Sequence, residues 1–292
     1  MRRTSGSGLT RCGVAGPSGS GLDRVTLRGD KKRCLSIHIP RGDAASARYL
    51  AREIFEYETY AAQGLEVTKG DTVVDVGANI GLFSIWASDL GARVLAFEPQ
   101  QDAYQALVKN CGGRDVVARR VAIGRDPGEA LITSYRGASG WGTLKPSKRS
   151  VMDDVAEHAA ARPLPSLVEL LLPRWARRQV GRLAAMALLS RESTSVCRVA
   201  TLSAELAELL GEGDRVKLLK IDVERGELDV LRGIHDFSRI DSVVAEVHDE
   251  EGGGVAEFVS VLESNGLRPR EPSQSKELLG TSLYTVFATR DN

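Results

Sequence analysis

Residues 72–81 read TVVDVGANIG, and this stretch decides the fold of the chain. Its first five residues form an apolar, β-branched run with the length of a buried parallel strand. Gly77 and Gly81 then bracket a turn where the backbone comes close to a ligand, because a Cβ at either position would obstruct that approach. Apolar residues recur at helical spacing after the turn, and a second apolar run over 93–98 ends on Glu98. The stretch therefore predicts a strand, a glycine-rich turn, a helix and a second strand.

Glu98 and the turn together predict an adenosine-containing cofactor. An acidic side chain at the tip of the second strand can accept the hydroxyl protons of a ribose. A dinucleotide site needs Gly-x-Gly-x-x-Gly for its pyrophosphate, whereas this turn reads Gly77-x-Asn79-x-Gly81, and Asp75 precedes it by two residues. A carboxylate there suits a cationic amino acid group and would repel a pyrophosphate. We therefore expect S-adenosylmethionine, which has an ammonium and a sulfonium, and keep a nicotinamide-dependent oxidoreductase as the alternative.

Composition and charge narrow the class of partner. The chain has 292 residues, with 39 basic and 39 acidic side chains and a formal net charge of zero. This balance provides no overall field that would attract nucleic acid, so we expect none as a partner. No uninterrupted apolar stretch approaches the ~20 residues of a membrane-spanning helix. The cysteines form no C-x-x-C pair, which predicts neither a zinc site nor a disulfide framework and is typical of a soluble, cytoplasmic protein; they are Cys12, Cys34, Cys111 and Cys197.

The chain divides into a tail, a short N-terminal cover and one large α/β domain. Residues 1–22 are rich in Gly, Ser and Arg, which predicts a flexible tail. Within residues 23–70 we expect a strand over 34–40 and a helix over 44–60, whose apolar residues follow a helical period. This helix either covers the cofactor or substrate, or simply packs on the sheet.

Strands alternate with helices over residues 71–292, which predicts a largely parallel sheet with helices on both faces. The last apolar run has no helix after it, and a terminal strand inserted antiparallel would complete a seven-stranded sheet. The expected strands cover 72–76, 93–98, 116–122, 216–221, 242–247, 267–271 and 283–289.

The alternation fails over residues 134–196, which we interpret as an insertion or lid. Residues 139–144 have the composition of a loop that carries an exposed aromatic residue. The Arg- and Leu-rich stretch 164–189 is helical by pattern but contains Pro165 and Pro173. Its basic and apolar faces allow three interpretations: a lid or substrate wall, a homodimer contact, or a membrane-surface helix. The prolines count against stable membrane association, because they interrupt the amphipathic surface that it needs.

A second apolar strand, 216–221, opens into a charged turn that contains Asp222 and Glu224. Parallel strands present their C-terminal ends at one edge of a sheet, and ligands of open α/β sheets bind at that edge. We therefore expect these two carboxylates beside Asp75 and Glu98. The alternative is that they only cap the helix that follows.

The neighbouring strand should bring Glu246 and His248 to the same rim. We expect His248 or Asp222 to act as the catalytic base, with Glu224 as the alternative. A histidine with the usual pKa of ~6.5 is largely neutral at cellular pH and can accept a proton. The motifs require no metal, although a cluster of Asp222, Glu224 and His248 could bind Mg²⁺.

The charged turn also indicates the class of acceptor. Methyltransferases that act on exocyclic base nitrogens typically have an Asn/Asp-Pro-Pro-Tyr/Phe turn at this position, which holds a planar amine. Residues 222–224 read DVE, without a proline or an aromatic residue. A hydroxyl acceptor suits this acidic rim better.

Four motifs together resemble the FkbM-type S-adenosylmethionine-dependent methyltransferases: DVGANIG at 75–81, AFEP at 96–99, KIDVE at 220–224 and ELDVLRG at 227–233. The resemblance covers about residues 45–290. It implies a class I methyltransferase fold, Rossmann-like, with a seven-stranded sheet, helices on both faces and an antiparallel last strand. It also implies O-methylation of a small-molecule hydroxyl acceptor, such as a polyketide, a peptide-derived natural product or a sugar.

The same resemblance assigns roles to individual residues. Asp75, Gly77, Asn79 and Gly81 would line the methionine part of the cofactor, Glu98 would bind its ribose, and Asp222 would lie close to the sulfonium or the acceptor. The chain departs from the family where Arg225 and Gly226 replace the usual Gly and a small residue. That change keeps one further alternative, a module that binds the cofactor without catalysis.

Overall fold

The central element of the fold is a seven-stranded sheet with the order β13-β14-β12-β11-β4-β5-β6. The computed structural model describes residues 14–15, 21–28, 34–55, 66–136, 138–145, 152, 156, 173–250, 252–274 and 281–290. β14 pairs antiparallel with both of its neighbours, and the other pairs are parallel, as the sequence predicted. The strands are β4 (Thr72–Val76), β5 (Arg93–Phe97), β6 (Val116–Arg119), β11 (Leu218–Ile221), β12 (Ser242–His248), β13 (Leu267–Pro269) and β14 (Leu283–Arg290).

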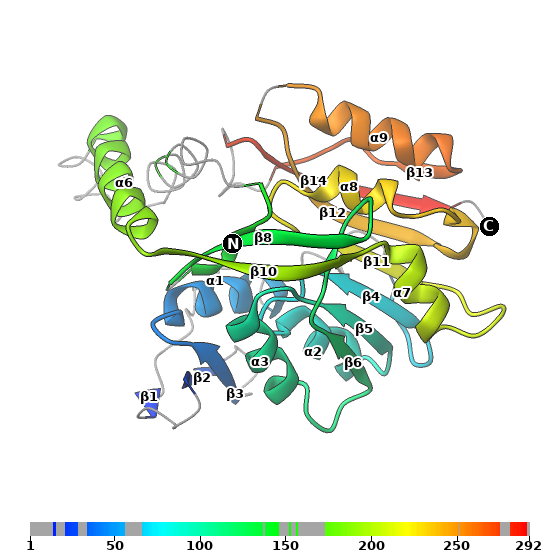
Figure 1. Cartoon of the computed structure of the whole chain (residues 1–292), viewed down its shortest axis with the longest axis horizontal. Coiled ribbons are helices and arrows are strands. Elements are labelled where there is room, and N and C mark those ends of the chain that lie inside the picture. Colours follow the sequence, from blue (N-terminus) through cyan, green and yellow to red (C-terminus); the bar gives the residue numbers. More distant parts are fainter. Residues whose placement is uncertain are drawn as a thin grey trace, which may run out of the picture.

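Helices cover both faces of this sheet, which confirms the predicted layers (Figure 1). One core cluster joins the sheet to α1 (Ala44–Phe55), α2 (Leu82–Asp89) and α3 (Gln101–Asn110). The other joins it to α7 (Leu202–Leu209), α8 (Glu227–Arg232) and α9 (Gly254–Ser264), with a short 3₁₀ helix at Phe237–Arg239. The apolar runs that predicted β4, β5 and β11 are buried along almost their whole length, because helices cover them from both sides.

The N-terminal segment is more ordered than its composition suggested. β1 (Val14–Ala15), β2 (Leu22–Arg28) and β3 (Cys34–Pro40) form a small antiparallel sheet, so the predicted tail contains a strand at residues 14–15 and the start of another. Apart from Gly21, the other residues of that tail lie outside the described part of the chain. α1 ends at Phe55, and the remainder of the expected 44–60 helix also lies outside it.

A second sheet replaces the loop that the sequence predicted over 139–144. It has the order β7-β10-β8-β9 and consists of β7 (Ala122–Ile123), β8 (Gly128–Tyr135), β9 (Ala138–Thr143) and β10 (Glu192–Ala200). The loop prediction was wrong because β9 pairs antiparallel with β8, and β8 with β10, which comes more than fifty residues later in the chain. Figure 1 shows β8 and β10 crossing in front of the main sheet. The side chain of Trp141 lies outside the described residues.

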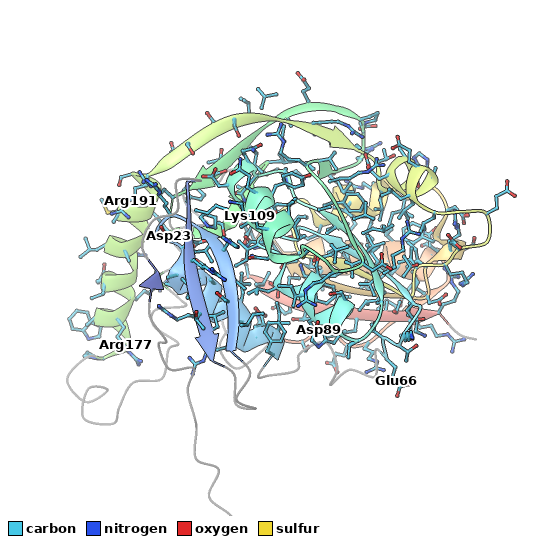
Figure 2. All side chains as sticks on the ribbon, turned by 90° about the horizontal axis from the view of Figure 1, so that it is seen from below. Asp23, Glu66, Asp89, Lys109, Arg177 and Arg191 are labelled. Atoms are coloured by element: carbon cyan, nitrogen blue, oxygen red, sulfur yellow. The ribbon has the colours of Figure 1, made fainter. Side chains whose placement is uncertain are left out.

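α6 (Arg174–Leu189) leads into β10 at the margin of the molecule. It begins directly after Pro173, and residues 164–172 of the predicted helix lie outside the described part. Figure 2 shows Arg177 near one end of α6 and Arg191 just beyond the other. Trp175 and Leu183 of this helix are largely exposed. Among the described residues, no helix is long and apolar enough to cross a membrane.

Candidate active site

A cavity of about 390 Å³ lies at the C-terminal edge of the main sheet. The loops that follow β4, β5 and β11 form part of its wall, together with the end of β12, one side of α1 and β9. The sequence-predicted residues Gly77, Asn79 and Glu98 are in this wall, and so are Asp222, Glu224, Glu246 and His248. The edge that the sequence indicated is therefore the edge that holds the cavity.

The turn after β4 has a left-handed backbone at three positions, with φ of 80° at Gly77, 49° at Asn79 and 85° at Gly81. A Cβ on Gly77 would lie 1.8 Å from the carbonyl oxygen of Asp222, so this position needs glycine for both conformation and space. A Cβ on Gly81 would lie 2.6 Å from a methyl carbon of Leu107 on α3. Gly81 therefore serves helix packing, and it is not among the residues that line the cavity.

Asp75 also lies behind the cavity wall, which corrects its predicted contact with the cofactor. Its side chain is completely buried, and Oδ2 accepts a hydrogen bond of 2.7 Å from the hydroxyl of Ser84. Oδ1 lies 3.1 Å from Nζ of Lys220. Asp75 is thus fully engaged by the protein and supports the turn from below.

Lys220 links this buried carboxylate to the cavity, and the sequence analysis missed its role. Nζ lies 3.0 Å from Oδ2 of Asp222 and 3.3 Å from the carbonyl oxygen of Gly77. The two carboxylates together raise the pKa of Lys220, although burial alone would lower it. The sequence did contain an indication of this role, because Lys220 is a charged residue within an otherwise apolar strand. In the structure it lies opposite Asp75 in the register of β11 with β4.

Glu98 occupies the place that the sequence predicted for it. It is 3 % exposed, and its two oxygens accept hydrogen bonds of 2.8 Å from the backbone N–H groups of Asn79 and Gln100. Burial raises its pKa to about 7, while these two hydrogen bonds act in the opposite direction. Each oxygen keeps a second lone pair with which it can accept a hydrogen bond from a hydroxyl group.

We expect Glu98→Gln to weaken binding of an adenosine-containing ligand by about 10- to 100-fold, the value of a charge-assisted hydrogen bond. In a glutamine amide the NH2 group replaces one carboxylate oxygen, so one of the two backbone N–H groups would face another donor and lose its hydrogen bond. In the wild type, affinity should rise from about pH 6 to about pH 8, because ionisation of a carboxyl group with a pKa near 7 restores its acceptor atoms. Titration calorimetry measures both effects, with Glu66→Gln as control, because Glu66 is exposed and does not line the cavity. A pH profile that is the same in Glu98→Gln and wild type would contradict this role.

His248 lies between two carboxylates. Its Nε2 is 3.1 Å from Oε2 of Glu224, and its Nδ1 is 2.6 Å from Oε1 of Glu227. Burial alone would lower its pKa, but the hydrogen bonds to these two residues raise the pKa of His248 well above its usual range. The raised pKa favours the protonated imidazole, whereas the sequence analysis expected a neutral histidine that accepts a proton.

We expect His248→Gln to destabilise the protein by about 1.5–3 kcal/mol near neutral pH, because one amide cannot replace both charged N–H donors. A raised histidine pKa stabilises the fold below the unfolded pKa of ~6.5, and this contribution is lost as pH rises through the folded pKa. The difference in melting temperature between wild type and variant should therefore shrink as pH increases. A loss of turnover by 10²–10⁴-fold at unchanged stability would instead indicate a neutral base.

Glu224 is fixed by several contacts, and the turn after β11 is fixed with it. Its Oε2 lies 3.3 Å from Nη1 of Arg225, and Arg225 also forms an ion pair with Glu250. Its carbonyl oxygen accepts a hydrogen bond of 2.6 Å from the hydroxyl of Thr143 on β9. Asp222 contacts Lys220, and Glu224 contacts Arg225 and His248, so these two carboxylates do more than cap α8.

A polar chain fixes Asn79 from the opposite side of the cavity. The hydroxyl of Ser139 on β9 lies 2.8 Å from Oδ1 of Asn79 and contacts the buried carboxyl group of Asp43, which precedes α1. Burial raises the pKa of Asp43, against the effect of its serine hydrogen bonds. This contact could not be predicted from the sequence, because its three residues come from separate segments of the chain.

Among the described residues, no group of three His, Cys, Asp or Glu side chains is arranged to hold a metal ion. Of the proposed Mg²⁺ ligands, Asp222 contacts Lys220, while Glu224 and His248 contact each other.

Comparison with known proteins gives a consistent result. Residues 75–269 match the methyltransferase FkbM domain family. The chain is 32% identical over 269 residues to the 31-O-demethyl-FK506 methyltransferase FkbM of Streptomyces tacrolimicus, a match that covers 87% of this chain and 96% of that protein. It is 29% identical over 279 residues to methyltransferase 1 of Beauveria bassiana, which covers 92% and 99% of the two chains. It is also 30% identical over 281 residues to the AMB antimetabolite synthetase AmbE of Pseudomonas aeruginosa, covering 88% of this chain but 12% of that protein.

Proposed function

The chain belongs to the FkbM methyltransferase family, and we propose that it methylates a hydroxyl group of a small-molecule natural product. Its cofactor is S-adenosylmethionine, as the sequence predicted. The alternative of a nicotinamide-dependent oxidoreductase is therefore set aside.

The residues around the cavity fit this cofactor. Among the described residues, five carboxyl side chains line the cavity against two cationic ones, and each of these cations already contacts two carboxylates. A ligand that brings positive charge and no phosphate suits such a surface. In our proposal Glu98 binds the ribose, Gly77 and Asn79 surround the methionine part, and the apolar residues 121–123 face the adenine.

S-adenosylmethionine supplies an electrophilic methyl group, so the protein contributes mainly by positioning the acceptor. Alignment of reacting groups can provide about 7–11 kcal/mol. We propose that Asp222, held by Lys220 at the cavity wall, orients the acceptor hydroxyl beside the cofactor. Glu224 and His248 hold the turn that carries Asp222.

The observation that carries the proposed acceptor is the acidic turn after β11, which faces the cavity without a proline or an aromatic ring. The relative from Streptomyces tacrolimicus is named a 31-O-demethyl-FK506 methyltransferase, which supports methylation of an oxygen in a small molecule.

We also propose that the second sheet forms the acceptor wall. β9 lines the cavity and is joined to the cofactor loops at two points, since Nε2 of Gln100 donates a hydrogen bond of 2.7 Å to the carbonyl oxygen of Ser139, and Thr143 contacts Glu224. This arrangement supports a substrate wall formed by β9, within the insertion 134–196, and the lid interpretation of residues 164–189 stays a prediction. The homodimer contact remains a prediction for α6.

The test is incubation of the full chain with methyl-deuterated S-adenosylmethionine and a set of polyketide, peptide-derived and sugar acceptors. Mass spectrometry should find the label on a hydroxyl oxygen, and Asp222→Asn should lower turnover by about 10²-fold or more. Asp241→Asn, at the opposite end of β12, serves as control. Label on nitrogen would overturn the hydroxyl acceptor. Cofactor binding without turnover of any acceptor would favour the non-catalytic module.

A further inference from the structure

The cavity wall contains a pair of carboxyl groups to which the proposed function gives no role. Glu53 lies on α1 and Glu246 on β12, both line the cavity, and their side chains are in hydrogen-bond contact. An ionised carboxylate has acceptor atoms only, so two carboxyl groups can share a hydrogen bond only if one of them carries a proton. A hydrogen bond between Glu53 and Glu246 therefore requires a proton on one of the two carboxyl groups.

The groups around the pair favour retention of this proton. Burial raises the pKa of Glu246 well above its usual range, and the negative charges of Asp222 and Glu53 raise it further, whereas Lys220 lowers it. The charge of Lys220 is shared between Asp75 and Asp222. On the other side of Glu246, the residue opposite it on β14 is the uncharged Thr285. His248, two residues further along β12, is already paired with Glu224 and Glu227.

We propose that the Glu53–Glu246 pair releases its proton when the positively charged cofactor enters the cavity and regains a proton from the acceptor during methyl transfer. The inference rests on the proposed use of this cavity. An opposite charge within about 4–6 Å lowers a carboxyl pKa by about 1–3 units, so a sulfonium at this wall favours the ionised pair.

The proton and charge balance closes over one turnover. The acceptor oxygen bonds to the methyl carbon as the carbon–sulfur bond breaks, and the electron pair of that bond remains on sulfur. The hydroxyl proton moves to a carboxylate oxygen of Glu246, which restores the hydrogen bond to Glu53. Loss of positive charge on sulfur thus accompanies loss of one negative charge on the pair, and the sum of the two charges stays constant.

The experiment is titration calorimetry of the full chain with S-adenosylmethionine and, separately, with S-adenosylhomocysteine. Repetition in buffers that differ in ionisation enthalpy gives the number of protons released on binding. The two ligands share the adenosine and amino acid groups, so proton release at Glu98 is common to both. We expect S-adenosylmethionine to release more protons, with the difference approaching about one proton at a pH within the range over which the protein stays folded. Equal release across that range would overturn the proposal.

Two variants locate the proton. A glutamine amide can donate the hydrogen bond without a titrating proton, so Glu246→Gln and Glu53→Gln should each abolish the difference while S-adenosylhomocysteine still binds. Glu263→Gln, an exposed residue on α9, should keep the wild-type difference. A difference that survives in both Glu53→Gln and Glu246→Gln would also overturn the proposal. Because no acceptor is present, the proton count is independent of whether the acceptor is a hydroxyl, and failure of methylation alone would contradict only the proposed function.

Discussion

Replacement of Gly77 by alanine is expected to weaken binding of S-adenosylmethionine by about 100-fold, because displacements of about 1 Å in a site have effects of that size. The new methyl group would lie 1.8 Å from the carbonyl oxygen of Asp222. That carbonyl cannot easily move away, since the N–H of the same residue donates a hydrogen bond of 3.0 Å to Val76 on β4. The turn must therefore shift, and it carries Asn79 and the acidic rim of the cavity with it.

A matched glycine separates this collision from backbone strain. Gly113 has the same φ of 80° as Gly77, but a Cβ there would meet nothing within 4 Å. Gly113→Ala should cost only the strain of a left-handed residue, about 1–2 kcal/mol. Gly77→Ala should add about 1–3 kcal/mol for overpacking. Denaturant unfolding and titration calorimetry on both variants measure the two effects. Equal losses of stability with unchanged cofactor affinity would show that the close approach to Asp222 is unimportant.

Replacement of Lys220 by methionine should cost about 3–5 kcal/mol of stability, because it leaves the buried carboxylate of Asp75 without its cation. It should also release Asp222, whose side chain lies 3.0 Å from the same ammonium group, and so reduce turnover. Lys217→Met serves as control, since Lys217 is only half-buried and precedes β11.

The double variant Asp75→Asn with Lys220→Met tests the cause of this loss. It removes both charges and keeps a polar group beside Ser84, so it should recover much of the stability lost in Lys220→Met. Turnover should stay low, because Asp222 still lacks its partner. If the loss of stability in the double variant equals the sum of the losses in the single variants Asp75→Asn and Lys220→Met, the two charges are not coupled.

The sequence predicted the strands of the main sheet well because their signal is local. β4 and β14 are apolar runs whose burial follows from their own composition, and their predicted bounds agree with the structure to within one residue. β8 and β10 escaped prediction for a physical reason. Each has an exposed side that includes a large apolar residue, Leu131 or Val196, so neither shows a regular alternation of buried and exposed positions.

The position of the site could be predicted from the sequence, but the contacts between its side chains could not. Glu98, Asp222 and His248 lie together at the C-terminal edge of the parallel strands, as expected. The partners of these groups come from distant segments: Glu227 reaches His248 from α8, and Glu53 reaches Glu246 from α1. The pKa of a side chain depends on such contacts, and two carboxyl groups raise the pKa of His248 that the sequence analysis took as the usual one.

The two backbone hydrogen bonds to Glu98 have a consequence for the rate at which the protein works. Through this one carboxylate, the turn after β4 and the turn after β5 are tied together before any ligand arrives. The entropy cost of ordering these turns is therefore incurred once, when the protein folds, and not at each binding event. In our proposal these turns hold the adenosine, so the cofactor product can leave and a new cofactor can enter without local refolding between turnovers.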